Sequence, residues 1–517
     1  MYITDTQLAA DDGSSLVGFS RPSPGVLRTV EDKLREAVSV KDYGAVGDGT
    51  TDDTDAIQYA LATGGPVYVP PGTYLVSSLT IAVAGTRLFG AGPGSILRHT
   101  NAALNAITVT VDDVEISDLR MEGCATSATD EKFAIYTESA HPATRLGIER
   151  VIFSGATSSL GFTNAIKFDA NCDYGRVRDC RFERLWGTAT NFGYGILVGG
   201  ITGGLFAGNT GIGTTSRGRH FLYLSSGASK CWAISNHSSG WYGEPFAIYS
   251  TNEQDTCDGN VIAFNTIDAA ASVASSSTGA IALAQNVANT LVIGNIIAAS
   301  ASCGIKADGT DSSLFKNNRF IGNTIVNSGF IGIDAISLQG GDISNNDVRE
   351  SSQSSPGTYS NIRLASDGSI ASSNILVSGN RSTGTSQARS AFQLNATSPV
   401  PTGIKVMGNY FPACQVTSIE LNGVACAIDG FIRAAVTWDL GSVADGGFEE
   451  KDAISVPGAE VGDQVLVQHT SLAAAGWHLA ATCYSSGWVR AVAFNDTGAS
   501  VNPASGTLYI RVLKETF

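Results

Sequence analysis

The stretch from residue 217 to residue 255 carries the densest set of side chains suited to acid–base chemistry in this 517-residue chain. It reads RGRHFLYLSSGASKCWAISNHSSGWYGEPFAIYSTNEQD. The candidate catalytic residues in it are Arg219, His220, Tyr223, Glu244 and Tyr249. The candidate substrate-binding residues are Trp241, Tyr242, Glu253 and Asp255 from this stretch, with Lys167 and Lys306 from other segments.

One chemistry that these side chains suit is β-elimination at a uronic acid. Removal of the C5 proton needs a cation beside the sugar carboxylate, a base with a pKa near the working pH, and an acid for the leaving oxygen. Arg219 is the candidate cation, His220 the candidate base, and Tyr223 or Tyr249 the candidate acid or base. Histidine has an unperturbed pKa close to neutrality, and the chain holds only six histidines. A purely structural role, in which His220 bonds within a turn, is an equally good interpretation.

A second chemistry is glycoside hydrolysis by two carboxylates. The two groups must lie roughly 5 Å apart for retention of configuration, or roughly 6.5 to 9.5 Å apart for inversion. Acidic residues are plentiful on any soluble surface, so pairs of them are weak signals, and we favour the lyase. The candidate pairs are Glu244 with Glu253 or Asp255, Asp179 with Glu183, and Asp169 with Asp308.

No metal site or cofactor is expected. The acidic run in VSVKDYGAVGDGTTDDTDAIQYAL, residues 38–61, fails the calcium-loop pattern, because Asp53 stands where glycine is needed and Tyr59 where glutamate is needed. The acidic residues instead suit turns and the start of a short helix over residues 53–61. The nine cysteines are scattered without a Cys-x-x-Cys pair. We therefore expect buried reduced thiols and folding in a reducing cytoplasm, rather than a zinc site or a disulfide framework.

Composition excludes several classes of partner. The net charge of −15 argues against a nucleic acid, which needs clustered Lys and Arg to neutralise phosphates. The first residues, MYITDTQLAADDG, lack the basic and apolar regions of a signal peptide. No apolar run approaches the length of a membrane span. With 59 glycines and only 15% charged residues, the composition is typical of a regular β architecture.

A repeat of short apolar strands, each followed by asparagine, predicts how the candidate residues are positioned. The interval between these asparagines is 23 to 34 residues, and no helical pattern intervenes. Such a period favours coils of a parallel β-helix, in which equivalent residues stack about 4.8 Å apart and the asparagines form an internal ladder. A sandwich or barrel would need hairpin turns every ~10 residues. The asparagines are Asn209, Asn236, Asn265, Asn295, Asn323, Asn346, Asn380 and Asn409.

A second, interleaved set of strands is expected to carry the substrate-facing side chains. Its alignment predicts an outward row that is basic and aromatic, and aromatic faces and cations suit sugar rings and carboxylates. An ordinary hydrated face is the alternative for any one of these residues. The predicted row is Lys167, Leu197, Tyr223, Tyr249, Ala282, Lys306, Ser337, Arg363 and Gln393. A second row two residues further on is Asp169, Gly199, Ser225, Thr251, Ala284, Asp308 and Gln339.

The two ends of the chain differ from the repeat. The helix at 53–61 is expected to cover the open apolar end of the solenoid. Before it, Val26, Val30, Leu34 and Val38 recur every four residues, which predicts a short helix that needs association to be stable. We expect a neck at 1–37, a β-helix carrying the site at 38–433, and an antiparallel β-sandwich at 434–517.

These segments resemble a known family. The stretch 38–61 resembles the opening motif of the pectate-lyase-like right-handed β-helix superfamily, and GSSLVGF…RTVEDKLRE before it resembles the neck of bacteriophage tailspikes. The ending VGDQVLVQH…ASGTLYIRVLK looks like their C-terminal trimerising sandwich, and GRHFLYLSS resembles a segment of phage-encoded β-helix depolymerases. The opening motif is specific to the fold and not to the chemistry.

The resemblance implies a homotrimeric tailspike of the virion that acts at the bacterial surface. Its substrate would be a capsular or O-antigen polysaccharide, and its N-terminus would attach to a baseplate or tail protein. The resemblance further implies depolymerase activity, as a polysaccharide lyase or a glycoside hydrolase, in a site within one subunit or between subunits. A non-catalytic adhesin or structural fibre is the alternative from another class. In tailspikes of this kind a large head-binding domain precedes the neck, so the resemblance leads us to expect a chain that is either trimmed or attached through another protein.

Overall fold

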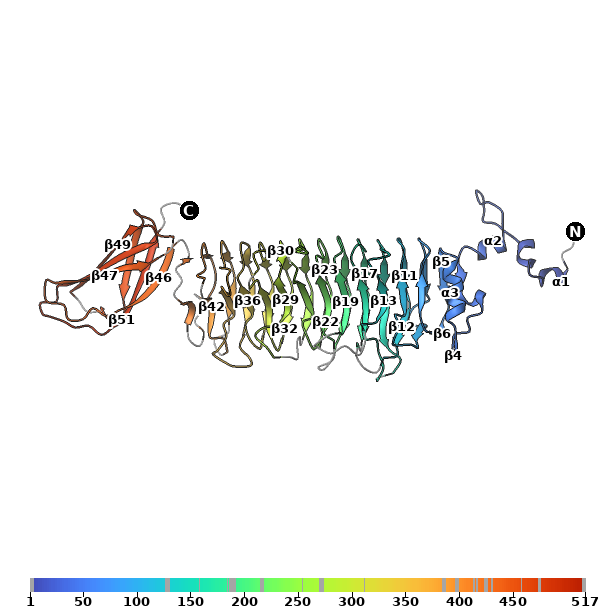
Figure 1. The fold of residues 1–517 in the computed structure, drawn as a ribbon, viewed down its shortest axis with the longest axis horizontal. Coiled ribbons are helices and arrows are strands. Elements are labelled where there is room, and N and C mark those ends of the chain that lie inside the picture. Colours follow the sequence, from blue (N-terminus) through green and yellow to red (C-terminus); the bar gives the residue numbers. More distant parts are fainter. Residues whose placement is uncertain are drawn as a thin grey trace. The chain divides into compact units, whose positions relative to one another are not determined.

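The computed structural model describes most of the chain. The described residues are 4–125, 131–157, 159–183, 185, 192–213, 218–252, 254–268, 274–310, 312–383, 387–395, 399–411, 414, 417–422, 426–428, 431–456, 458–472 and 476–513. The chain divides into two compact units, Met1–Gly213 with Arg217–Arg219, and Thr214–Ser216 with His220–Phe517. Both units contain stacked parallel strands, as Figure 1 shows, so the expected all-β architecture with a parallel β-helix is confirmed.

Each coil of the first unit contributes one strand to each of three parallel sheets. Every strand pairs in parallel with its counterpart in the next coil, which satisfies the backbone amides and carbonyls without hairpins. Sheet 1 holds β5 (Pro66–Val69), β8 (Arg87–Gly90), β11 (Glu115–Ser117), β14 (Gly147–Glu149), β17 (Arg176–Arg178) and β20 (Leu205–Ala207). Sheet 2 holds β6 (Gly72–Val76), β9 (Ser95–His99), β12 (Arg120–Gly123), β15 (Ile152–Gly155), β18 (Arg181–Glu183) and β21 (Thr210–Ile212). Sheet 3 holds β7 (Leu79–Ile81), β10 (Ile107–Val109), β13 (Phe133–Thr137), β16 (Asn164–Phe168) and β19 (Tyr194–Gly199).

The second unit repeats the same three-sheet coil. Sheet 1 holds β23 (Trp232–Ile234), β27 (Val261–Ala263), β31 (Leu291–Ile293), β34 (Arg319–Ile321), β37 (Asp342–Ser344), β40 (Leu376–Ser378), β43 (Lys405–Met407) and β45 (Cys426–Ile428). Sheet 2 holds β24 (His237–Ser239), β28 (Thr266–Asp268), β32 (Ile296–Ala298), β35 (Thr324–Val326), β38 (Asp347–Arg349) and β41 (Arg381–Thr383). Sheet 3 holds β22 (His220–Ser225), β25 (Phe246–Ser250), β29 (Gly279–Gln285), β33 (Cys303–Asp308), β36 (Ile333–Ile336), β39 (Ile362–Ala365), β42 (Ser390–Asn395) and β44 (Thr417–Asn422). The short strands β26 (Cys257–Asp258) and β30 (Val287–Ala288) pair beside them.

The predicted asparagine ladder is present inside the coils. Asn265 donates through its side-chain amide to the side-chain oxygen of Asn295 at 2.9 Å, and Asn295 donates in the same way to Asn323. Each side-chain oxygen also accepts the backbone N–H of the asparagine one coil earlier. The N–H of Asn265 lies 3.0 Å from the side-chain oxygen of Asn295, and the N–H of Asn295 lies 3.0 Å from that of Asn323. Equivalent bonds join every successive pair from Asn236 to Asn409. The ladder satisfies buried corner amides that a regular strand would leave unpaired.

The predicted capping helix is α3, Thr54–Ala62. Its buried face carries Ile57, Ala60 and Leu61, which agrees with the expected apolar stripe. The helix begins at Thr54, whose backbone N–H donates to the Asp52 carboxylate at 3.0 Å. It is preceded by β3 (Val38–Ser39), the 3-10 helix η2 (Val40–Tyr43) and β4 (Asp48–Asp52).

The expected neck helix is much shorter than the spacing of its valines and leucine suggested. It is α2, Val30–Leu34, and none of its residues is buried. Val26 lies outside it with 76% of its surface exposed, and Leu34 is exposed as well. The rest of this segment forms α1 (Asp5–Leu8), η1 (Gly13–Leu16), β1 (Gly18–Phe19) and β2 (Arg28–Thr29).

After the last coil the strands become antiparallel. One sheet pairs β46 (Phe431–Trp438) and β48 (Gln464–His469) with β51 (Gly506–Leu513). Another pairs β47 (Phe448–Ser455) and β49 (Trp477–Ser485) with β50 (Trp488–Asn495). Side chains of both sheets share one apolar core that includes Trp438, Val489 and Ile510.

Among the described residues, no helix has the length and apolarity to cross a membrane. The cysteines whose side chains are described are all free thiols, and most of them are buried. Burial raises the pKa of Cys180 to about 12, with a similar effect on Cys303, so these thiols stay protonated and unreactive.

Candidate functional site

His220 opens strand β22 and is held in one orientation. Its Nδ1 lies 2.7 Å from the backbone carbonyl oxygen of Glu244. A carbonyl oxygen can only accept, so Nδ1 carries a proton, and the lone pair of a neutral ring is on Nε2. The ring of Tyr223 lies against the imidazole with 4.8 Å between ring centroids. Only 4% of the His220 side chain is exposed, whereas Tyr223 is partly exposed.

The segment 240–245 supplies the group that orients His220. The Glu244 carboxylate lies 4.0 Å from His220 Nδ1, so both its backbone and its side chain adjoin the imidazole. Tyr242 is partly exposed in the same segment. Trp241 is 1% exposed and packs on Phe221 with 5.6 Å between ring centroids. Trp241, named above as a candidate substrate-binding residue, is therefore packed against the core of β22 in this structure.

The predicted outward row is correct in part. Backbone pairing places Tyr223 beside Ala247 and not beside Tyr249, because Leu222 pairs with Phe246. Ser337 is replaced in the row by Asp334. Tyr249 instead lies in the second row, in place of Thr251, and Ile336 takes the place expected for Gln339. The row on sheet 3 of the second unit is Tyr223, Ala247, Ala282, Lys306, Asp334, Arg363, Gln393 and Glu420.

Lys306 lies in a buried ion cluster on this row. Its ammonium contacts a carboxylate oxygen of Asp334 at 2.8 Å and one of Asp308 at 3.6 Å. Arg363 contacts both carboxylate oxygens of Asp334, at 2.7 and 2.8 Å. Burial alone would raise the pKa of Asp334, but Arg363 and Lys306 outweigh burial and lower it. The ammonium of Lys306 thus already has two carboxylate partners, which limits its capacity to bind an acidic sugar.

Arg219 belongs to the first unit, where its guanidinium contacts a tyrosine. Nη1 of Arg219 donates to the hydroxyl oxygen of Tyr194 at 3.0 Å, and its backbone N–H donates to the carbonyl of Gly193 at 2.9 Å. Burial raises the pKa of Tyr194, and the charge of Arg219 opposes that effect only in part. The pair is a fixed cation beside a protonated phenol, which is a combination suited to holding a carboxylate and donating a proton.

Lys167, also in the first unit, lies among groups that suit sugar contact. Its ammonium is 5.3 Å from the ring centroid of Tyr136 and 3.6 Å from a carboxylate oxygen of Asp169. Tyr136 pairs with Lys167 between β13 and β16, so the two residues share the outward row of that unit. Lys167 and Leu197 are paired as predicted.

The predicted carboxylate pairs receive little support from the described residues. Glu253 lies outside the described part of the chain. Asp255 is exposed and accepts a hydrogen bond from Asn252 at 2.8 Å. Asp169 and Asp308 belong to different units, and each has a lysine as its nearest cation.

Sequence reasoning missed Tyr136, Tyr194 and Asp334. One signal for Tyr136 was available, since FAIYT at 133–137 repeats almost unchanged as FAIYS at 246–250. No sequence pattern marked Asp334, because the segment after Ile333 was aligned three residues too far along.

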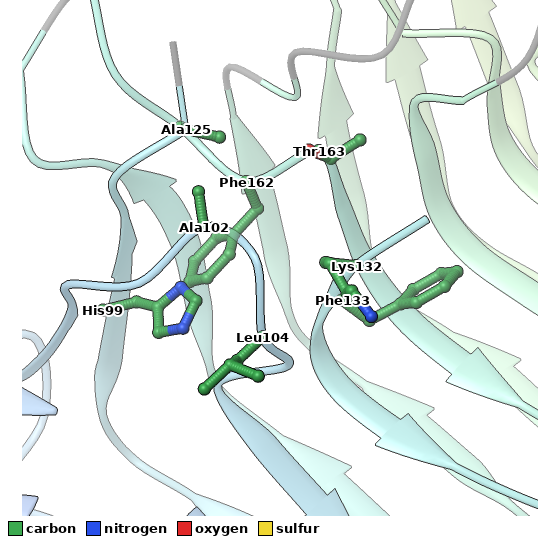
Figure 2. A pocket seen from close by; sticks show the side chains of 9 residues that line it. His99, Ala102, Leu104, Ala125, Lys132, Phe133, Phe162 and Thr163 are labelled. Carbon is green, nitrogen blue, oxygen red and sulfur yellow. The ribbon is translucent and has the colours of Figure 1, made fainter. Parts of the chain in front are cut away.

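A small pocket on the first unit is too small for a sugar. It has a volume of about 10 Å³, which is about the space of one water molecule. Figure 2 shows the ring of His99 beside that of Phe162 in its lining. His99 Nε2 bonds the carbonyl of Ser77 at 3.0 Å, and burial lowers the pKa of His99 to about 4. This histidine is a neutral structural group.

The described residues contain no group of three or more His, Cys, Asp or Glu side chains placed to hold a metal ion.

Comparisons with known proteins agree with this fold. A family model described as rhamnogalacturonase A/epimerase, pectate lyase-like, matches residues 37–157. The tail spike protein of Shigella phage Sf6 is 37% identical over 106 residues, which cover 18% of this chain and 17% of that protein. Alginate lyase 7 of Azotobacter vinelandii is 36% identical over 120 residues, 19% of this chain and 14% of that protein. These matches span less than a fifth of each curated relative.

Among solved structures, a mutant tailspike protein of E. coli bacteriophage HK620 in complex with a pentasaccharide aligns with a TM-score of 0.61. It is 13% identical, and the alignment covers 99% of both chains. The fold places the protein in the class of parallel β-helices, and its segment 37–157 is similar to the pectate-lyase-like family. Within that class, the resemblance to phage tailspikes that was predicted from the sequence is confirmed.

Proposed function

We propose that this chain is a phage tailspike that binds and depolymerises a bacterial capsular or O-antigen polysaccharide. The relatives support this proposal, since a tail spike, an alginate lyase and a tailspike crystallised with a pentasaccharide share its sequence motif or its fold. We further propose that cleavage is an endo-acting β-elimination at a uronic acid. The observation that carries the lyase assignment is the fixed imidazole of His220, whose Nδ1 proton is held by the Glu244 carbonyl.

The proposed reaction uses neighbouring residues of the β22 region. His220 takes the C5 proton through Nε2, the C4–O bond breaks, and a C4=C5 double bond forms as the leaving oxygen takes a proton from Tyr223. A cation that neutralises the uronate carboxylate makes the C5 proton more acidic, and Arg219 is the candidate because it is next to His220 in the sequence. Tyr249 and Tyr242 contact neighbouring sugars. Trp241 supports β22 from the core in this scheme.

Two results would assign another function. New reducing ends without an unsaturated product would indicate a hydrolase that uses paired carboxylates. Unchanged polymer length with retained binding would indicate an adhesin. The hydrolase alternative keeps Glu244 and Asp255 as its candidate acids, since both lie in the stretch 217–255.

The test is incubation of the protein with a panel of purified capsular and O-antigen polysaccharides, with and without uronic acids. We expect ultraviolet absorbance from an unsaturated uronate to appear together with a fall in polymer length, and only for uronate-containing polymers. Cleavage of a polymer that lacks uronic acid would overturn the lyase assignment. Failure to bind or cleave any polymer from a susceptible host would overturn the tailspike proposal.

We also propose that the functional particle is a homotrimer attached to the virion tail through its N-terminal segment. Support comes from the neck, where Val26, Leu27 and Leu34 expose apolar side chains that a single chain leaves uncovered. Association of three necks would cover these side chains and stabilise helices that are too short to persist alone. The antiparallel strands after residue 433 would add a second zone of association.

A further inference from the structure

The second unit carries an apolar patch on the outside of its solenoid. Trp232 on β23 pairs with Val261 on β27, and Val261 pairs with Leu291 on β31, so the three side chains form one outward row. Ile234 and Ile293 extend a parallel row two residues further on. Trp232 is 51% exposed, Phe264 63% and Ile296 51%. We call this set the apolar patch: Trp232, Ile234, Val261, Phe264, Leu291, Ile293 and Ile296.

Phe264 occupies a backbone position that selects against a large side chain. It forms the corner between β27 and β28 with φ 56°, in the left-handed region that bulky residues rarely adopt. The same corner in the other coils of this unit holds Ser235, Gly294, Gly322, Asn345, Gly379 or Gly408. The Phe264 ring also lies so close to Gly294 that a Cβ added there would be 2.6 Å from the ring. A strained position that keeps an exposed phenyl ring indicates that the ring has a function outside the chain.

The patch is local. In the first unit, the outward positions of sheet 1 include the charged residues Glu149, Arg176 and Arg178. Further along sheet 1 of the second unit the row becomes polar again, since Leu291 pairs with Arg319 and Arg319 pairs with Asp342. A solenoid exterior of this kind is expected to be polar, so a contiguous apolar area marks a contact with another molecule.

The chemistry of the patch favours a protein partner over a sugar. A sugar site combines aromatic faces with polar groups that read the hydroxyls, and all seven side chains of the patch are hydrocarbon except for the Trp232 indole nitrogen. Aliphatic side chains beside half-exposed aromatic rings are instead typical of the core of a subunit interface.

We infer that the apolar patch is where copies of this chain meet in the assembled spike. This inference rests on the proposed homotrimer. Copies arranged in parallel around a threefold axis bring the same coil of each chain to the same height, so one patch meets its own equivalents. The net charge of −15 makes copies repel, and an uncharged area is where they can approach closely.

The exposed area fits a contribution to such an interface. A covered Trp or Phe side chain buries roughly 150–250 Å², so Trp232 and Phe264 alone offer on the order of 200 Å² per copy. A stable interface takes roughly 800 Å² per partner. The patch therefore supplies part of the interface, and the exposed neck residues Val26, Leu27 and Leu34 supply another part.

The direct test is chemical cross-linking of a cysteine variant. In Trp232→Cys, the new thiols of neighbouring copies should be joined by a short bis-maleimide, giving covalent dimers and trimers on denaturing gels. The wild-type protein, treated in the same way, shows how much cross-linking the native cysteines give. Tyr410→Cys is the matched control, because Tyr410 is 60% exposed and lies outside the patch, so it should not cross-link. Equal cross-linking of both variants, or of neither, would overturn the inference.

A second variant tests the same surface without cross-linking. Ile293→Lys should shift the sedimenting species from trimer toward monomer, whereas Tyr410→Lys should not. If the wild-type protein is trimeric and Ile293→Lys stays trimeric while losing polysaccharide binding, the patch is a sugar surface and the inference fails with the tailspike proposal intact. If the wild-type protein sediments as a single chain, both the homotrimer and this inference fail.

Discussion

At the scale of single residues, hydrogen bonds hold the side chains of His220 and Asp334 in one orientation, although both residues belong to the sheet proposed to face the substrate. His220 is fixed by one backbone carbonyl, and Asp334 by three charged hydrogen bonds. The two residues differ in charge and in protonation. Asp334 has its charge fully compensated, so its role is structural, whereas the orientation of His220 assigns the lone pair of a neutral ring to Nε2.

His220 is the residue on which the lyase proposal depends. We expect His220→Gln to lower kcat on the native polymer by about 100-fold or more, as loss of a general base does, with an unchanged melting temperature. His237→Gln is the matched control, because His237 is exposed on β24. Loss of stability without loss of activity per folded molecule would make His220 a structural residue.

The ion cluster gives a stability prediction. Asp334→Asn leaves the buried Lys306 and the partly buried Arg363 without their shared carboxylate and should cost about 3–5 kcal/mol in the free energy of unfolding. Asp342→Asn, which removes the partly exposed partner of Arg319, should cost less than about 1 kcal/mol. The pKa of Asp334 is lowered in the fold, so its contribution is present above the usual aspartate pKa of 3.8 and is lost as pH falls below that value. Urea unfolding of both variants at neutral pH checks the ranking, and equal costs would contradict it.

His99 should give the first unit a separate pH dependence. Burial lowers its pKa from 6.5 to about 4, so between these values the unfolded chain binds a proton that the folded chain excludes. Stability should therefore rise from pH 4 to pH 6.5 and then level off. The shift corresponds to at most about 3 kcal/mol. In His99→Gln the melting temperature should vary less over this range than in the wild-type protein, and an unchanged slope would show that another group is responsible.

At the scale of elements, the sequence predicted the repeating coil of the β-helix, but it predicted only part of the residue pairing between strands of neighbouring coils. The asparagine period identified the coils because the ladder requires the same side chain at the same corner in each turn. The rows were misaligned at Tyr249 and Ser337, because the backbone pairs Tyr223 with Ala247 and Lys306 with Asp334. Loop lengths of the individual coils set that register, and they leave no periodic signal. The burial of Trp241 and His220 depends on how segment 240–245 folds back on β22, which periodicity does not report.

The ladder is testable at one rung. Asn295 accepts from Asn265 and donates to Asn323 and to the Ile262 carbonyl, so Asn295→Ala leaves several buried polar groups without partners. Each such group costs about 1–3 kcal/mol, and we expect at least that loss in urea unfolding. Asn101→Ala, in an exposed turn, should be nearly neutral. A neutral Asn295→Ala would show that the coils are held by backbone pairing and apolar packing alone.

At the scale of the whole molecule, protection of backbone amides against hydrogen exchange should depend on assembly in the neck but not in the coils. Amides in the coils are paired on both sides with neighbouring coils, so they should exchange with solvent slowly in any oligomeric state. The neck differs, because neither α1 nor α2 has a buried residue in the single chain. Helices of four and five residues do not persist without contacts from outside.

Hydrogen exchange followed by mass spectrometry therefore separates assembly from folding. In the assembled wild-type spike, residues 4–37 should be protected, because necks of neighbouring copies cover Val26 and Leu34. In Ile293→Lys, which should weaken association, the neck should lose its protection while the coils keep theirs, since the substitution lies on the outside of the solenoid. Protection of the neck in a variant shown to be monomeric would mean that contacts within one chain stabilise it. Val26 and Leu34, which are exposed in the single chain, would then be covered by a different partner. The tail protein proposed to bind the N-terminal segment would be the next candidate partner to test.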